Sequence, residues 1–226
     1  MNKDNCLIDW REIDHILLDM DGTLLDRWFD DYFWEELVPK EYAKKNRLTF
    51  EMAREELLGR YRLYLGELAW TDLDFWTREL DMDIAGLKEG ASCMIGLDPT
   101  AIEFLIYLRG LKKSITLVTN AHWKTIEIKL KKTRIDDHLD RIISAFDIGM
   151  PKERVLFWKR LEDLIGFKRE RTLLIDDNED VLRAAREYGL RFLLQKAKAS
   201  SKAPMNPSKD FEFITEFRGL IALGPS

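Results

Sequence analysis

The sequence predicts an α/β fold, in which a Rossmann-like parallel sheet forms a three-layer α/β/α core and carries an inserted α-helical cap. Short apolar runs recur along the chain, and each ends in polar turn residues. Helical patterns alternate with these runs, which is the order that a parallel sheet requires. Residues 27–97 break the alternation with helical patterns rich in aromatic and acidic residues, and no strand-like run occurs among them.

Five apolar runs have the composition of buried parallel strands, because they are short and are closed by turn residues. They comprise residues 15–18, 114–118, 141–146, 171–175 and 190–194. In a sheet of this kind, ligands bind beyond the carboxyl ends of the strands. The polar residues that follow these runs are therefore candidates for a functional site.

Helices are expected between the strands, where apolar side chains recur at helical spacing. These segments comprise residues 102–108, 123–133, 155–161 and 181–188. Gly189 is expected to end the last of them. A further short helix near the C-terminus is predicted by the spacing of Phe211, Ile214, Phe217 and Ile221.

Three lysines, Lys129, Lys131 and Lys132, lie in the helix predicted at residues 123–133. The apolar face of that helix is formed by Trp123, Ile126, Leu130 and Thr133. Lysines outside an apolar face are usually solvated. We therefore expect all three lysines to face solvent.

Length and charge limit the domain organisation and the partners. At about 150 residues per domain, a chain of 226 residues corresponds to a core, expected at residues 1–26 and 98–226, with a cap domain at residues 27–97. A net charge of −5 argues against nucleic-acid binding led by phosphate contacts. The two cysteines cannot form a disulfide framework, and no signal region or membrane-length apolar run is present. We expect a cytoplasmic protein with no nucleic-acid or membrane partner; the sequence specifies no oligomeric state.

Pairs of aspartates follow two of the predicted strands. Asp19 and Asp21 close the first run, and Asp176 and Asp177 close the run at residues 171–175. Carboxylates this close repel one another unless a cation compensates them or a proton is shared. A single pair of aspartates at a strand end would be interpreted as capping a loop or a helix. Two pairs on separate strands favour a functional site instead. An all-oxygen site without a nearby histidine or cysteine suits Mg²⁺.

Four motifs resemble the signatures of the haloacid dehalogenase-like (HAD) hydrolase superfamily. Residues 19–23 (DMDGT) resemble the first signature and residues 119–120 (TN) the second. Lys152, expected to open a helix, resembles the third, and residues 175–180 (IDDNED) resemble the fourth. The order and spacing agree with the family. One departure is that Glu153 follows the lysine where the family commonly has proline, while Pro151 precedes it.

The resemblance implies a covalent mechanism of phosphate-ester hydrolysis. Asp19 would attack phosphorus and form an aspartyl-phosphate. Asp21 would act as general acid toward the leaving alcohol and then as general base toward water. Lys152 would pair with Asp19 and with the phosphate oxygens, stabilising charge in the transition state.

The resemblance also implies the binding residues. Thr119 and the following main-chain N–H groups, beginning at Asn120, would hold phosphate oxygens, together with Lys152. Mg²⁺ would be held by Asp19, by the main-chain carbonyl of Asp21 and by Asp177, with Asp176 beside it. The metal would offset the repulsion between an anionic nucleophile and an anionic phosphate. The implied partner is a small phosphorylated substrate.

A closer similarity, to bacterial GMP/IMP nucleotidases, extends beyond the catalytic motifs into the predicted insertion. It is carried by residues 17–26 (LLDMDGTLLD), 29–30 (FD), 32–34 (YFW), 37–39 (LVP), 119–122 (TNAH) and 151–153 (PKE). It implies a purine 5′-nucleotidase that releases nucleoside and phosphate. The alternatives are a phosphatase or phosphomutase for a sugar phosphate or another small phosphometabolite, and a non-catalytic module that senses such a metabolite. Most aromatic residues of the insertion are expected to form its own small core.

Overall fold

A computed structural model describes residues 8–221 of the chain. The predicted core range therefore includes residues at both ends, 1–7 and 222–226, that lie outside the described residues. Within residues 8–221, no helix has both the length and the apolar character that crossing a bilayer requires.

A single parallel sheet of six strands forms the centre of the fold, with strand order β3-β2-β1-β4-β5-β6. β1 is therefore flanked by β2 and β4. The strands are β1 (His15–Leu18), β2 (Ser114–Thr119), β3 (Arg141–Ser144), β4 (Thr172–Asp176), β5 (Phe192–Lys196) and β6 (Glu212–Ile214). The predicted parallel sheet is confirmed.

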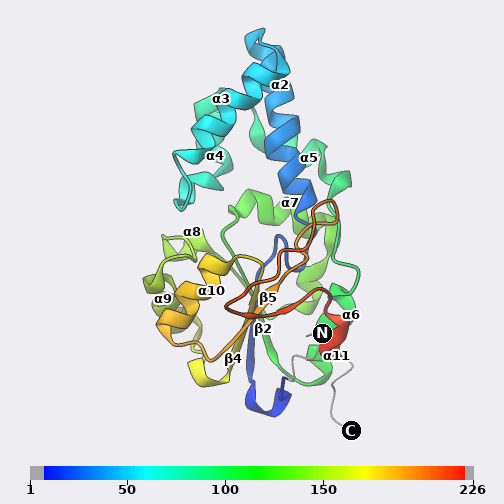
Figure 1. Ribbon diagram of the computed structural model, residues 1–226, viewed down its shortest axis with the longest axis vertical. Helices are drawn as coiled ribbons and strands as arrows, with labels where there is room; N and C mark the ends of the chain where they lie inside the picture. The colour runs from blue at the N-terminus through cyan, green and yellow to red at the C-terminus, as the bar shows by residue number, and fades with distance from the viewer. Residues whose placement is uncertain (1–7, 222–226) are drawn as a thin grey trace.

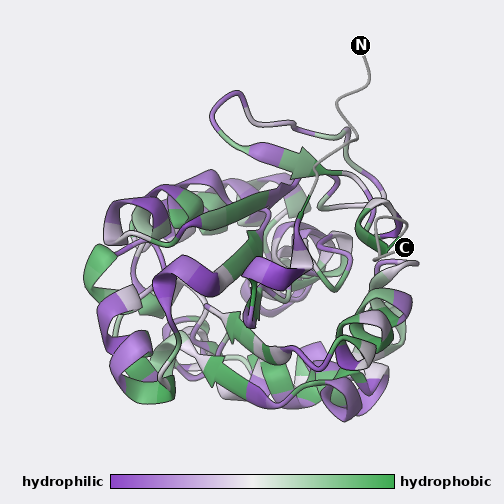
Figure 2. Cartoon of the chain, turned by 90° about the horizontal axis from the view of Figure 1, so that it is seen from below, coloured by the Kyte–Doolittle hydropathy of each residue, from purple (hydrophilic) through white to green (hydrophobic). Residues whose placement is uncertain are grey.

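Helices cover both faces of this sheet, because successive strand side chains point to opposite sides. Ile16 and Leu18 belong to the cluster on one face, and Leu17 belongs to the cluster on the other. Figure 2 shows the largely hydrophobic strands enclosed by helices. The helices of the core are α6 (Ala101–Gly110), α7 (Trp123–Thr133), α8 (Ala145–Ile148), α9 (Val155–Ile165), α10 (Glu179–Tyr188) and α11 (Arg218–Ile221). Gly189 ends α10 in a left-handed conformation, as predicted.

The insertion between β1 and β2 is helical throughout and has a buried cluster of its own, which includes Phe33, Leu57 and Trp76. Its helices are α1 (Trp28–Tyr32), a π-helical turn (Phe33–Leu37), α2 (Val38–Asn46), α3 (Phe50–Arg62), α4 (Leu73–Leu80) and α5 (Ile84–Gly90). Short 3₁₀ turns complete the chain at Trp10–Glu12, Leu68–Trp70, Ser92–Met94, Ile135–His138 and Arg169–Arg171. The insertion extends away from the sheet at the top of Figure 1.

The two connections of the insertion run side by side. Leu25 and Leu97 form an isolated antiparallel bridge. The N–H of Asp26 donates to the carbonyl of Gly96 (2.9 Å), and the N–H of Asp98 donates to that of Leu24 (2.9 Å). The insertion therefore leaves and re-enters the core at one place.

Two predicted elements differ from the structure. The apolar run at 141–146 becomes a helix after Ser144, because the Ser144 hydroxyl accepts from the Phe146 N–H (3.2 Å) and the Asp147 carboxylate accepts from the Ser144 N–H (2.9 Å). These two bonds form a capping box, which starts a helix at this point. Near the C-terminus, the expected single helix is instead strand β6 followed by the short α11. β6 pairs with the edge of β5, where the Ala197 N–H donates to the Ile214 carbonyl (2.8 Å).

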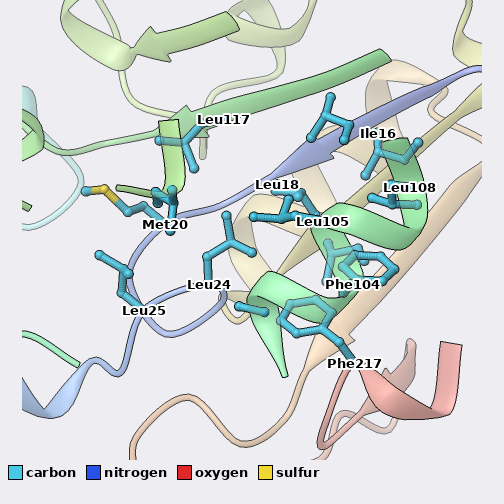
Figure 3. Close-up of a cluster of buried hydrophobic side chains, with 14 of the residues drawn as sticks. Ile16, Leu18, Met20, Leu24, Leu25, Phe104, Leu105, Leu108, Leu117 and Phe217 are labelled. Atoms are coloured by element: carbon cyan, nitrogen blue, oxygen red, sulfur yellow. The ribbon is translucent and has the colours of Figure 1, made fainter. Parts of the chain in front are cut away.

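Phe104 and Phe217 link α6 to the chain just before α11 in the same hydrophobic cluster (Figure 3). Both rings are fully buried, and they stack with centroids 4.7 Å apart. We expect Phe104→Ala to lower the free energy of unfolding by about 3–5 kcal/mol, since it leaves a cavity beside Phe217. Urea unfolding followed by circular dichroism measures this loss.

The control for this variant lies on the same helix. Ile106 is 55% exposed, and Ile106→Ala is expected to change stability by less than about 0.5 kcal/mol. Equal losses for the two variants would contradict this packing analysis.

Candidate active site

The ends of three neighbouring strands bring the predicted site residues together. Leu18, the last residue of β1, is in register with Leu117 of β2 and Ile175 of β4. Asp19 therefore follows β1 at the level where Asp176 ends β4, and its N–H donates to the Ile175 carbonyl (3.0 Å). Thr119 ends β2 on the other side. The topology thus places the first, second and fourth motifs at one edge of the sheet.

Lys152 links all three of these strands near their ends. Its ammonium lies 2.6 Å from Asp19 Oδ1 and 2.7 Å from Asp176 Oδ2, and it donates to the Val118 carbonyl (3.1 Å). The residue is 2% exposed. The sequence predicted that Lys152 opens a helix, and this prediction is wrong. Lys152 lies in a turn, and α9 begins at Val155.

Glu153 accounts for the departure from the lysine–proline pattern. Its carboxylate accepts hydrogen bonds from the Asn120 side chain (3.0 and 3.2 Å) and from the Asn178 side chain (3.3 Å). Asn120 Oδ1 in turn accepts from the Lys152 N–H (2.9 Å). The side chain of Asn120 thus links the lysine turn to the end of β2, and the carboxylate of Glu153 is held between Asn120 and Asn178.

Three carboxylates form a compact oxygen cluster. Asp19, Asp176 and Asp177 each offer an oxygen, and these atoms all lie within 4.8 Å of one another. Asp177 Oδ2 also lies 2.8 Å from the guanidinium of Arg27. Gly22 packs against Asp177: it has φ +89°, and a Cβ there would lie 2.6 Å from Asp177 Oδ2. A set of hard oxygen donors with excess negative charge fits a divalent cation.

Burial and mutual repulsion raise the pKa values in this cluster. Desolvation is the main cause for each group. It raises the pKa of Asp19 and of Asp176 to about 6, with Lys152 opposing the shift, and raises that of Asp177 to about 7, where Asp19 adds repulsion. The neighbouring carboxylates keep Lys152 charged by raising its pKa further above the ordinary range. The two cations Lys152 and Arg27 do not neutralise three carboxylates, so the cluster favours either protons or a metal ion.

Asp21 lines the same cavity as this cluster but pairs with a different cation. Its Oδ1 lies 2.5 Å from the ammonium of Lys129 on α7. Partial burial is the main cause that raises the pKa of Asp21 to about 6; Asp30 adds to the shift, and Lys129 opposes it. At this pKa, the carboxyl can hold or release a proton near neutral pH.

The solvent-facing position predicted for Lys129 is wrong. Lys129 is fully buried, whereas Lys131 and Lys132 are exposed. The buried face of α7 is formed by Thr125, Ile126 and Lys129. Because Lys129 is three residues after Ile126, helical spacing alone places it on the core side. That spacing is the signal that could have found it.

A cavity of about 380 Å³ connects the carboxylates to the insertion. On the core side it is lined by groups that include Asp19, Lys152 and Asp177, and on the insertion side by Trp34, Tyr61 and Trp70. The Thr71 hydroxyl of the insertion donates to the Asn120 carbonyl (2.6 Å). This volume lies in the range of small-molecule binding sites.

The chain belongs to the haloacid dehalogenase-like hydrolases, whose family model matches residues 13–189. Its sequence is 37% identical over 214 residues to the GMP/IMP nucleotidase YrfG of Escherichia coli (strain K12), covering 95% of this chain and 96% of that protein. The GMP/IMP nucleotidase YrfG of Shigella flexneri matches to the same extent. The chain is a phosphoric monoester hydrolase of this family.

Solved structures show the same fold. A HAD phosphatase from Thermococcus onnurineus superimposes with a TM-score of 0.76 at 20% identity, covering 93% of this chain and 97% of that one. L-2-haloacid dehalogenase from Xanthobacter autotrophicus has a TM-score of 0.63 at 16% identity, covering 95% of this chain and 100% of that one. The putative HAD-hydrolase YfnB from Bacillus subtilis, bound to magnesium, has a TM-score of 0.63 at 17% identity, covering 94% and 99%.

The raised carboxyl pKa values predict how metal and pH act together on stability. The ordinary aspartate pKa is 3.8, so between about pH 4 and pH 7 the folded metal-free protein holds protons that the unfolded chain has lost. The cluster's contribution to stability therefore falls as pH rises through this window. We expect Mg²⁺ to raise the melting temperature more at pH 7.5 than at pH 5, relative to chelator.

Two variants locate this effect. Asp177→Asn is expected to reduce the Mg²⁺-dependent shift at pH 7.5, because it removes one oxygen anion from the cluster. Asp180→Asn is the matched control, since Asp180 is exposed and pairs with Arg183 at 2.7 Å. Equal metal shifts at both pH values, or an unchanged shift in Asp177→Asn, would contradict the assignment.

Proposed function

We propose that the protein is a Mg²⁺-dependent 5′-nucleotidase that hydrolyses the purine nucleotides GMP and IMP to nucleoside and phosphate. The observation that carries the proposal is that one cavity has both the catalytic carboxylates, on its core side, and aromatic rings, on its insertion side. The identity to the GMP/IMP nucleotidases supports it, because it spans 95% of the chain and so includes the insertion.

Asp19 acts as the nucleophile. Its carboxylate oxygen bonds to phosphorus as the bond from phosphorus to the leaving oxygen breaks, and the Asp21 carboxyl gives its proton to that oxygen. Asp21 then takes a proton from water, which attacks phosphorus. The bond to Asp19 breaks, and inorganic phosphate leaves. Lys152 keeps Asp19 oriented through their 2.6 Å contact.

In this proposal, the phosphate oxygens are bound by Thr119 and by the main-chain N–H groups that begin at Asn120. Lys152 binds them as well. Asp19, Asp177 and the main-chain carbonyl of Asp21 would hold Mg²⁺. Asp176, held by Lys152 (2.7 Å) and the Asn178 N–H (3.0 Å), would lie beside the ion. When bound, the ion offsets the negative charge that the substrate phosphate brings to the carboxylates.

Residues 27–97 serve as a cap domain over a core formed by residues 1–26 and 98–226. Arg27 of the cap pairs with Asp177 of the core (2.8 Å), and Thr71 of the cap contacts Asn120 of the core (2.6 Å). These contacts support the proposal that residues 27–97 cover the cavity. A cap in this position limits the access of water to the reacting phosphate.

The purine base binds among Trp34, Tyr61 and Trp70. Within the described residues, the Tyr61 hydroxyl is one of a few buried side-chain polar atoms without a hydrogen-bond partner. Burial raises the pKa of Tyr61, so the hydroxyl stays protonated and can donate. A buried donor without a partner is unfavourable, and the 6-oxo oxygen shared by GMP and IMP is an acceptor that would satisfy it.

The test of the function is phosphate release from a panel of nucleoside monophosphates and sugar phosphates, with Mg²⁺ and with chelator. We expect GMP and IMP to exceed the other esters in kcat/KM by about tenfold or more, and only with metal. Asp19→Asn is the control for contaminating phosphatases and is expected to lose turnover while keeping the fold. A preference for sugar phosphates would overturn the substrate, and activity in Asp19→Asn would overturn the covalent mechanism.

Tyr61→Phe tests the base contact, because it removes the hydroxyl and keeps the ring. The kcat/KM for GMP is expected to fall about tenfold, the effect of one lost hydrogen bond of about 1.4 kcal/mol. Hydrolysis of p-nitrophenyl phosphate, which lacks a base, should change little. Tyr64→Phe is the matched control, since Tyr64 lies three residues away and outside the cavity lining. Equal effects on both substrates would refute the contact.

A further inference from the structure

Two fully buried lysines connect Asp21 to the insertion. The ammonium of Lys129 lies 2.5 Å from Asp21 Oδ1 and 2.5 Å from Asp30 Oδ2. The other oxygen of Asp30 lies 2.7 Å from the ammonium of Lys88 on α5. The side chain of Lys129 is 0% exposed and that of Lys88 is 2% exposed. Asp21, Lys129, Asp30 and Lys88 are called the charged quartet below.

The charged quartet is neutral overall, with two ammonium groups and two carboxylates. Lysine is almost never fully buried unless it is paired, and an apolar side chain at position 129 would continue the core face of α7 without that requirement. The quartet is not the sole charged contact between α7 and α5, because the exposed pair Lys131–Glu89 (3.0 Å) spans the same two helices. The buried pairing therefore indicates a task at Asp21 itself.

We propose that Lys129 is a positioning residue that holds the Asp21 carboxyl for proton transfer, and that Asp30 and Lys88 hold Lys129 in turn. This inference rests on the proposed function, in which Asp21 is the general acid and base. Among residues 8–221, the hydrogen bonds of the Asp21 side chain engage only Oδ1. Oδ2 is left for the leaving oxygen of the ester in the cavity that Asp21 lines.

Asp30 fixes the position of the Lys129 ammonium relative to Asp21. With one partner, a flexible lysine ammonium can turn about its stem; with two carboxylates at 2.5 Å it is fixed between them. Lys88 neutralises the second carboxylate, so that Lys129 is not drawn entirely to Asp30. Asp30 lies on α1 and Lys88 on α5. The insertion thereby determines where the proton donor of the core is placed.

The test compares two aryl esters in the first turnover of the full-length protein with Mg²⁺. Phenol is a poorer leaving group than p-nitrophenol, so its release depends more on the proton from Asp21 while the bond from phosphorus to oxygen breaks. In Lys129→Met, we expect the first-turnover release of phenol from phenyl phosphate to fall at least tenfold more than that of p-nitrophenol from p-nitrophenyl phosphate. KM for both esters should change little.

Two further variants complete the design. Lys131→Met is the matched control, since Lys131 is exposed on the same helix and pairs with the same insertion; both esters should react as in the wild type. The double variant Lys129→Met with Asp30→Asn removes one charge of each sign, so the net charge of the buried site does not change. In this double variant, the release of phenol must also fall more than the release of p-nitrophenol. If Lys129→Met alone does not fold, the double variant is the one that is measured.

The outcomes separate this inference from the proposed function. Release of both leaving groups reduced by the same factor, or unchanged release of both, would overturn the positioning role of Lys129. Neither ester is a nucleotide, so a failure of the GMP and IMP prediction leaves this test intact. Absence of release from both esters by the wild-type protein would instead overturn the phosphatase mechanism and the inference with it.

Discussion

The buried ammonium of Lys152, between Asp19 and Asp176, is the interaction on which the site depends. Asp19 follows the central strand and Asp176 ends the next strand, so two carboxylates meet wherever these strands pair in register. Without a cation between them, their repulsion would oppose that pairing. Lys152 supplies this cation. It lies in a turn whose N–H donates to Asn120, and Asn120 in turn donates to Glu153. Lys152 and Arg27, which pairs with Asp177, compensate the cluster only in part, and the remaining negative charge is what makes the cluster suitable for a metal ion.

The cavity combines two kinds of surface with different origins. The charged surface comes from strand ends, whose positions are set by the register of the sheet. The aromatic surface comes from the insertion, whose rings also pack into its own cluster: Tyr61 contacts Trp34, Trp70 and Trp76 edge to face. Rings fixed in this way have little freedom to adjust to a ligand. A rigid aromatic wall opposite a fixed phosphate site favours ligands of one length and shape.

The fold and the carboxylate motifs were predictable because they are local in sequence. Apolar runs closed by aspartates identify β1 and β4, and glycine at position 189 ends α10. The burial of Lys129 was not predicted, because a lysine was assigned by its charge rather than by its spacing from Ile126, and because its partner Asp30 is 99 residues away. Strand β6 was missed since only three residues pair, and pairing with β5 decides their conformation. Glu153 was recognised as a departure, but its partners Asn120 and Asn178 become visible only when three loops meet.

The paired connections at Leu25 and Leu97 have an evolutionary consequence. Because the insertion leaves and re-enters the core at one point, a segment of another length or shape can occupy that place without disturbing the order of the strands. Substrate choice and bond cleavage can then diversify separately. The ion pairs of Asp30 limit this freedom. A segment transplanted onto this core without an anion at the place of Asp30 would leave Lys129 with only its contact to Asp21, so the insertion and position 129 on α7 depend on each other.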